Sequence, residues 1–214
     1  MDLNKKFALA PIAAALIGIG LPAHAQTTTY IFGTQLTGSL QPASSFATLS
    51  ATQSNGGSNY SFTLQLTSDF GSLFGNSDAF VRQVIFNTNG TDPIGSSVAL
   101  APGTWGVSSI RYNSNSGQPG SISFDFSETF GGGSSNRLTS GEQVSWFTNF
   151  ANPTNFVAPE FALHVQSIGA NGSSGWYIPT VTPIPEPESY AMLLAGLGLL
   201  GFVARRRQRK LAVA

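Results

Sequence analysis

The sequence of 214 residues contains no cysteine, and only 9% of its residues are charged. Without cysteine the chain cannot form a disulfide, a thiolate zinc site or a cysteine nucleophile. A domain that lacks such cross-links depends on its hydrophobic core for stability. The sequence provides for that core, because all but two of its 16 phenylalanines lie between residues 26 and 184.

Basic residues are also scarce in this central region. Residues 26–184 contain three basic side chains, Arg82, Arg111 and Arg137, against seven acidic ones, which leaves a net charge of −4. The other basic residues lie near the two ends of the chain, and they bring the formal net charge of the whole sequence to zero. Proteins that bind nucleic acid need a basic face, so this composition excludes nucleic acid as a partner of the central region.

The N-terminal segment has the pattern of a secretory signal peptide. Two lysines precede an uncharged stretch over residues 7–20, and Ala23-His24-Ala25 follows it. The small residues predict cleavage after Ala25 by signal peptidase, once the secretion machinery has exported the chain. An uncleaved anchor is the alternative, which the short apolar stretch disfavours. We therefore expect a signal peptide at residues 1–25 and one compact passenger domain at residues 26–182.

Alternating apolar and polar residues predict an all-β passenger. Tyr60, Phe62, Leu64 and Leu66 alternate with polar residues, as in a strand with one buried and one solvated face. Clusters of glycine, serine and asparagine separate the strand candidates, which favours an antiparallel β-sandwich of jelly-roll type. Only residues 78–85 also fit a helical stripe. The other strands are expected at residues 30–32, 46–51, 81–86, 98–100, 104–112, 122–126, 144–146, 161–165 and 176–180.

Candidate catalytic residues are few. His164 is the only histidine outside the signal peptide, and a Ser-His-Asp arrangement stays open because serines are abundant. No nucleophile-elbow motif accompanies it, and a single imidazole without cysteine makes a poor zinc site. Asp125 and Glu128 could form a glycosidase-like pair, with Glu142 on a neighbouring strand. Asp125 alternates outward between two phenylalanines, which favours a solvated face, so we expect no catalytic residue, no metal and no cofactor.

Two other groups of residues could bind a ligand. Asn87, Asn89 and Asp92 offer oxygen atoms to calcium, although they are also ordinary turn formers. Trp176 and Tyr177 lie beside a loop rich in glycine and serine and could form a sugar-stacking platform, as in β-sandwich carbohydrate-binding modules. Aromatic residues at strand positions more often belong to the core, so the platform is the alternative interpretation.

The C-terminal residues form a pattern of three parts. Proline and glutamate alternate from Pro185 to Glu188, residues 189–204 carry no charge, and five basic residues follow between Arg205 and Lys210. As a helix, the uncharged stretch would span roughly 24 Å, enough to cross a membrane with local thinning. The prolines prevent an earlier helix start, and the positive-inside rule places the basic tail in the cytoplasm. A buried helix of the soluble core is the alternative, which the basic tail disfavours.

This pattern resembles the PEP-CTERM sorting signal of Gram-negative bacteria over residues 183–210. The resemblance implies recognition by an exosortase, a membrane-embedded transpeptidase-like enzyme that removes the tail. It also implies export through the inner membrane, transient anchoring there, and a final place at the cell surface or outside the cell. The resemblance implies that the exosortase recognises Pro185, Glu186 and Pro187. It also implies that Arg205, Arg206 and Arg207 form the signal that retains the chain in the membrane.

Together these patterns predict an exported protein of the cell envelope or extracellular matrix, such as a biofilm, without catalytic activity. The alternative is a lectin-like module for the exopolysaccharide of the producing cell. A secreted hydrolase is the third hypothesis, and it would require a cleft that gathers His164 or two carboxylates.

Overall fold

The computed structural model describes residues 25–89, 93–94, 99–100, 107–114, 119–131, 136–181 and 195–198. Two short helical turns, η1 (Asn55–Gly57) and α1 (Phe70–Leu73), join strands in the described part. The strands are β1 (Gln26–Thr37), β2 (Ala47–Ser54), β3 (Asn59–Leu66), β4 (Phe80–Thr88), β5 (Ala99–Leu100), β6 (Ser109–Asn113), β7 (Phe126–Gly131), β8 (Gln143–Asn149), β9 (Phe156–Ile168) and β10 (Ser173–Val181).

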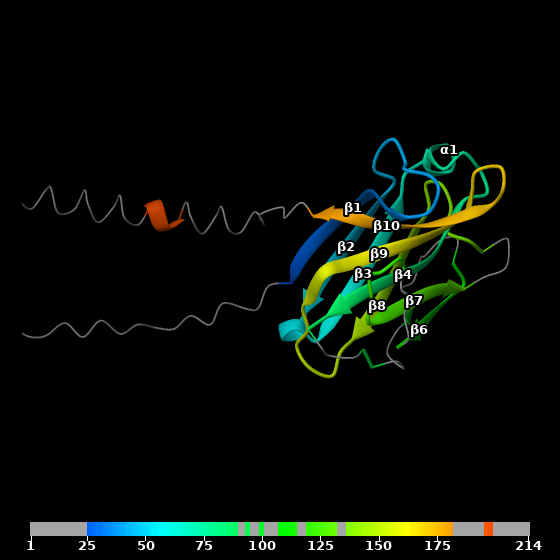
Figure 1. Ribbon diagram of the computed structural model, residues 1–214. Coiled ribbons are helices and arrows are strands. Elements are labelled where there is room, and N and C mark those ends of the chain that lie inside the picture. Colours follow the sequence, from blue (N-terminus) through cyan, green and yellow to red (C-terminus); the bar gives the residue numbers. More distant parts are fainter. Residues whose placement is uncertain are drawn as a thin grey trace, which may run out of the picture.

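These strands belong to one antiparallel sheet in the order β5-β8-β3-β2-β1-β10-β9-β4-β7-β6. The sheet curls until its two edge strands, β5 and β6, contact each other, so it is nearly closed and barrel-like (Figure 1). The prediction of an all-β antiparallel fold is confirmed, but the prediction of a sandwich, with two separate sheets, is wrong. Register shifts in the β1–β10 and β4–β9 pairs increase bending and twist, and they let one continuous ladder wrap around the core.

The inner face of this sheet holds the main core. The four apolar residues of β3 that alternate in the sequence are all at most 6% exposed, which confirms the predicted strand. The ring of Phe62 on β3 stacks on Trp146 of β8 at 5.1 Å and meets Phe161 of β9 edge-on at 6.2 Å. Aromatic rings therefore connect neighbouring and opposite walls of the sheet, as expected for a domain without disulfides.

A smaller cluster covers part of the outer face. Residues 122–125 form no strand; this segment crosses the outside of the sheet before β7 begins. The Asn87 side chain holds it, because its Oδ1 accepts from the Asp125 N–H at 2.9 Å and its Nδ2 donates to the Ser123 carbonyl at 3.3 Å. The strand predicted at 122–126 is therefore wrong except at Phe126. The cluster consists of Ile85, Phe124 and Ala162, with Leu36, Ile122, Trp176 and Ile178 packed against it.

The covered outer face also explains why the apolar pattern of residues 78–85 fits both a strand and a helix. From Phe80 the chain forms strand β4, and the helical alternative is wrong. Val84 and Phe86 belong to the main core, whereas Ile85 between them belongs to the outer cluster. A strand that is buried on both faces loses its alternation, and such a strand can imitate a helical stripe.

The ends of the passenger lie side by side. Tyr30 near the start of β1 pairs with Val181 at the end of β10, so the chain enters and leaves the sheet at the same end (Figure 1). The β9–β10 hairpin begins with Ser173 opposite Ile168, at the other end of the sheet. The two ends of β10 are eight residues, or roughly 26 Å, apart.

Candidate ligand-binding pocket

The predicted sorting residues lie outside the described residues, so their roles remain predictions. Ala25, the predicted cleavage position, is described and is exposed directly before β1. Residues 195–198 are helical and lie inside the predicted helix 189–204. Within the described parts of the chain, no helix has the length and apolar character needed to cross a membrane. The residues not described are Pro185, Glu186, Pro187, Arg205, Arg206 and Arg207.

Trp176 and Tyr177 point to opposite faces of β10. Tyr177 is fully buried in the main core, where its hydroxyl donates to the Leu40 carbonyl at 2.7 Å. Trp176 is half-buried on the outer face, where its ring stacks on His164 at 4.4 Å with an interplanar angle of 8°. The two aromatic side chains therefore do not form one sugar-stacking platform.

His164 lies on the outer face of β9 and is half-buried. Burial lowers its pKa, and the nearby Arg82 guanidinium lowers it further. A catalytic triad needs an acid that orients the imidazole, whereas the described neighbours that act on His164 are an indole ring and a cation. This environment disfavours the charged imidazole, and the ring packs against Trp176 of the neighbouring strand.

The three candidate carboxylates lie in different environments. Asp125 is exposed, as predicted, and its Oδ2 accepts from the Thr88 N–H at 3.3 Å. Glu142 closes a turn by accepting from the N–H and the hydroxyl of Thr139 at 2.7 and 3.0 Å. Glu128 is fully buried. Among the described residues, no three histidine, aspartate or glutamate side chains gather as a metal site requires.

Glu128 was a candidate from the sequence, but the sequence pattern did not predict that its carboxylate is buried. One of its oxygens accepts from the Trp146 indole N–H, and the other accepts from the Thr148 hydroxyl at 2.6 Å. Burial raises its pKa to about 7, and the two hydrogen bonds offset part of that effect. The side chain points into the aromatic core from β7, so we interpret it as a structural group.

The candidate calcium ligands hold neighbouring segments together. Asn87 fixes the segment before β7, and Asn89 Oδ1 accepts from the Asn155 N–H at 3.4 Å. Asp92 lies outside the described residues. The two asparagines thus behave as the turn formers that the sequence allows.

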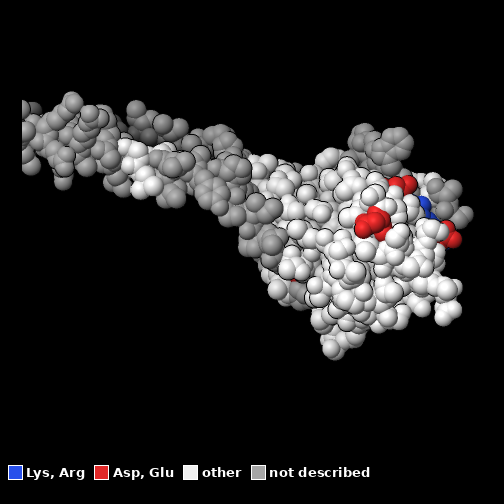
Figure 2. All heavy atoms as spheres, turned by 90° about the horizontal axis from the view of Figure 1, so that it is seen from above, with Lys and Arg blue, Asp and Glu red and all other residues white. Residues whose placement is uncertain are grey.

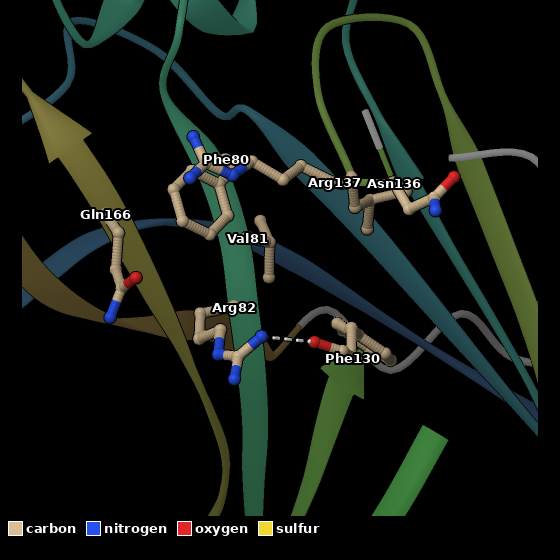
Figure 3. A pocket seen from close by; sticks show the side chains of 8 residues that line it. Phe80, Val81, Arg82, Phe130, Asn136, Arg137 and Gln166 are labelled. Carbon is tan, nitrogen blue, oxygen red and sulfur yellow. Dashed lines mark hydrogen bonds between the residues drawn. The ribbon is translucent and has the colours of Figure 1, made fainter. Parts of the chain in front are cut away.

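A polar pocket of about 370 Å³ opens between β4, the end of β7 and residues 136–138 (Figure 3). The backbone N–H of Val81 donates to the Leu138 carbonyl at 3.0 Å, which places this segment beside β4. The lining residues are Phe80, Val81, Arg82, Phe130, Asn136, Arg137, Leu138 and Gln166.

Both arginines of the pocket are held by neighbours. Arg82 Nη1 donates to the Phe130 carbonyl at 2.8 Å, and the Arg137 guanidinium lies 4.3 Å from the centre of the Phe80 ring (Figure 3). Among the described residues that line the pocket there is no carboxylate. Charged side chains are sparse on the face shown in Figure 2, where they gather toward one end of the molecule.

A second pocket, of about 190 Å³, lies where the chain enters the sheet. Tyr30 and Tyr60 line it together with uncharged polar side chains. Burial raises the pKa of both tyrosines. This pocket lacks the charged groups that distinguish the larger one.

Sequence reasoning missed the larger pocket because its residues come from four separate segments. Arg82 and Arg137 are 55 positions apart and share no motif. The sequence offered one signal, the scarcity of basic residues in the central region. Where few basic side chains are present, each of them is a candidate for binding an anionic ligand. Only the strand register brings these side chains together.

Comparison with known proteins identifies one family model in this chain. It is the PEP-CTERM protein-sorting motif, which matches residues 183–208. No curated protein and no solved structure matches the chain. The match agrees with the pattern of proline, glutamate, uncharged residues and arginine in the C-terminal segment, and it does not extend into the β-sheet domain.

Proposed function

Because residues 183–208 are a PEP-CTERM protein-sorting motif, we propose that this protein is an exported surface protein that an exosortase processes. Proteins with this motif are exported and anchored in the membrane before processing, and the motif implies an exosortase as the processing partner. In our proposal the basic tail from Arg205 lies in the cytoplasm until the C-terminal segment is removed. The working molecule then consists of the β-sheet domain alone.

The domain itself is proposed to act without catalysis, as a component of the cell envelope or extracellular matrix. His164 is stacked under Trp176, and the three candidate carboxylates are used in separate structural contacts. A weakly charged domain held by a large aromatic core suits a durable extracellular role. These observations support the proposal, and the secreted-hydrolase hypothesis gains no comparable support.

The sorting proposal is tested by exchanging the Glu186-Pro187 dipeptide for two alanines in the producing organism. We expect the variant to retain its C-terminal segment, which leaves its mass higher than that of the processed wild type, and to remain in the inner-membrane fraction. Intact mass and a fractionation blot measure the two effects. The matched control is Pro159→Ala with Glu160→Ala, which exchanges a proline-glutamate pair inside β9. Unchanged mass and location of the motif variant would contradict the proposal.

A second candidate role is carbohydrate binding. The observation that favours it is the polar pocket, which combines the carboxamides of Asn136 and Gln166 with two guanidinium groups. Sugar hydroxyls are recognised by such polar groups together with aromatic rings. In this proposal the pocket takes the place of the platform expected at Trp176 and Tyr177.

A further inference from the structure

The larger pocket concentrates the rare positive charge of the domain. Two of the three arginines between residues 26 and 184 line it, while Arg111 lies exposed on β6 and does not line it. Since none of the described lining residues carries a negative charge, the pocket differs in sign from a domain whose net charge is −4. This contrast points to a ligand that carries an anionic group.

The two guanidinium groups retain donors for such a ligand. Arg82 commits one Nη1 hydrogen to the Phe130 carbonyl, and Arg137 is held by its contact with the face of the Phe80 ring. A guanidinium carries five N–H donors in a planar fork that matches a carboxylate. In the part of the chain that the structure describes, no ion pair occupies either group. Both side chains are thus positioned in advance but still able to bind.

The remaining lining groups favour a sugar over a simple ion. Asn136 and Gln166 each offer a donor and an acceptor, which suits hydroxyl groups rather than a fully charged anion. A volume of about 370 Å³ is in the range of small-molecule sites and exceeds the needs of an inorganic anion. Among the units of polysaccharides, a uronic acid combines a carboxylate with several hydroxyls in this way.

The pocket lies at the end of the sheet opposite the point where the chain leaves it. Phe80 and Gln166 of the pocket pair with each other, and Gln166 pairs with Ser174 at the start of β10. The chain leaves the sheet at Val181, at the opposite end of that strand. A domain anchored through its C-terminal segment would therefore present this pocket away from the anchor.

From these observations we propose that the pocket of Arg82 and Arg137 binds uronic-acid units of an acidic polysaccharide. This inference rests on the proposed surface location, and it assigns the ligand class of the pocket. The two guanidinium groups form charge-assisted contacts with carboxylates of the polymer, and the two carboxamides contact its hydroxyls.

The experiment measures binding of the full chain, purified in detergent, to polygalacturonate, dextran sulfate and neutral dextran. The variants are Arg82→Gln and Arg137→Gln, and Arg111→Gln is the matched control. We expect polygalacturonate binding to weaken about tenfold or more in each pocket variant and to stay within about twofold in the control. Neutral dextran should not bind, and dextran sulfate should bind more weakly than polygalacturonate.

Thermal melting of every variant shows whether the variant is folded, so that loss of binding is not confused with unfolding. Arg82 also supports the Phe130 carbonyl, so Arg137→Gln decides the result if Arg82→Gln is unstable. The proposal is overturned by equal loss in the Arg111→Gln control, by dextran binding, by preference for dextran sulfate, or by no polygalacturonate binding. None of these outcomes affects the sorting proposal, because that proposal is judged by mass and cell fraction.

Discussion

At the scale of single residues, Glu128 is the most unusual group in the described structure. A carboxylate in an apolar core is costly when it is ionised, because burial removes its hydration. Two donors, the Trp146 indole and the Thr148 hydroxyl, supply hydrogen bonds to its two oxygens, and no basic side chain is among the groups that shift its pKa. Because the pKa of Glu128 is raised to about 7, the folded protein favours its protonated form up to about that pH.

Glu128 gives the stability of the domain a defined pH dependence. Its pKa is about 7 in the folded protein and 4.5 in an ordinary carboxyl, so its contribution is full below pH 4.5 and is lost as the pH rises to about 7. We expect the free energy of unfolding to fall by roughly 2 to 3 kcal/mol from this group over that range. Urea unfolding of the wild type and of Glu128→Gln at pH 5 and pH 8 measures the effect.

The comparison between the two proteins isolates Glu128 from other titrating groups. Burial also raises the pKa of Glu160, and that group stays in both proteins. Glu142→Gln is the control, because it changes a carboxylate that closes a turn at the surface of the sheet. A Glu128→Gln variant with the same pH dependence as the wild type would show that the carboxyl is hydrated in solution.

At the scale of elements, the segment before β7 extends the hydrophobic packing to the outer face of the sheet. It carries Phe124 onto the outer face of the sheet, against Ile85 and Ala162. The Asn87 side chain binds its backbone from β4. Because this segment covers one face of β4 and β9, the central strands are buried on both sides.

Removing the Phe124 ring should weaken this cover measurably. Phe124 is 4% exposed, and Phe124→Ala is expected to lower the free energy of unfolding by about 3 kcal/mol through lost burial and a cavity. Phe147 on β8 is 46% exposed, and Phe147→Ala is the matched control, with an expected loss of under about 1 kcal/mol. Urea unfolding measures both variants. Equal losses would mean that Phe124 is not packed as described.

At the scale of the whole molecule, one main core joins almost every part of the sheet. Residues from β1, β2, β3, β4, β7, β8, β9 and β10 belong to the same cluster of buried side chains. The sheet is continuous and nearly closed, and the smaller outer cluster lies on strands that also contribute to the main core, so the described strands share one core. The first and last described strands also pair with each other, which links the two ends of the domain.

This arrangement predicts a single unfolding transition. Tryptophan fluorescence arises from Trp105, Trp146 and Trp176, of which Trp146 reports on the interior between β8 and β7, whereas circular dichroism reports on all strands. We expect the two signals to change together in urea, because small domains with one core unfold as a unit. Midpoints that differ beyond experimental error would indicate a part of the sheet that unfolds independently.

Local patterns in the sequence were sufficient for the fold class and for the sorting motif. β3 and β8 were predicted because alternation along a strand with one buried face is a local property. The motif at residues 183–208 was identified for a similar reason, since all of its parts are close together in the chain. Residues 122–125 misled the prediction, because alternating apolar residues can also line a segment that lies across a sheet.

By itself the sequence determined that the chain is all-β, cysteine-free and marked for sorting, because composition and short-range order carry that information. Only the tertiary structure decided that the strands close into one sheet, that Glu128 enters the core, and that Tyr177 turns away from Trp176. It alone brought Arg82 and Arg137 into one pocket. The reason is physical: register and closure depend on hydrogen bonds between residues far apart in the chain, and no local pattern specifies those partners.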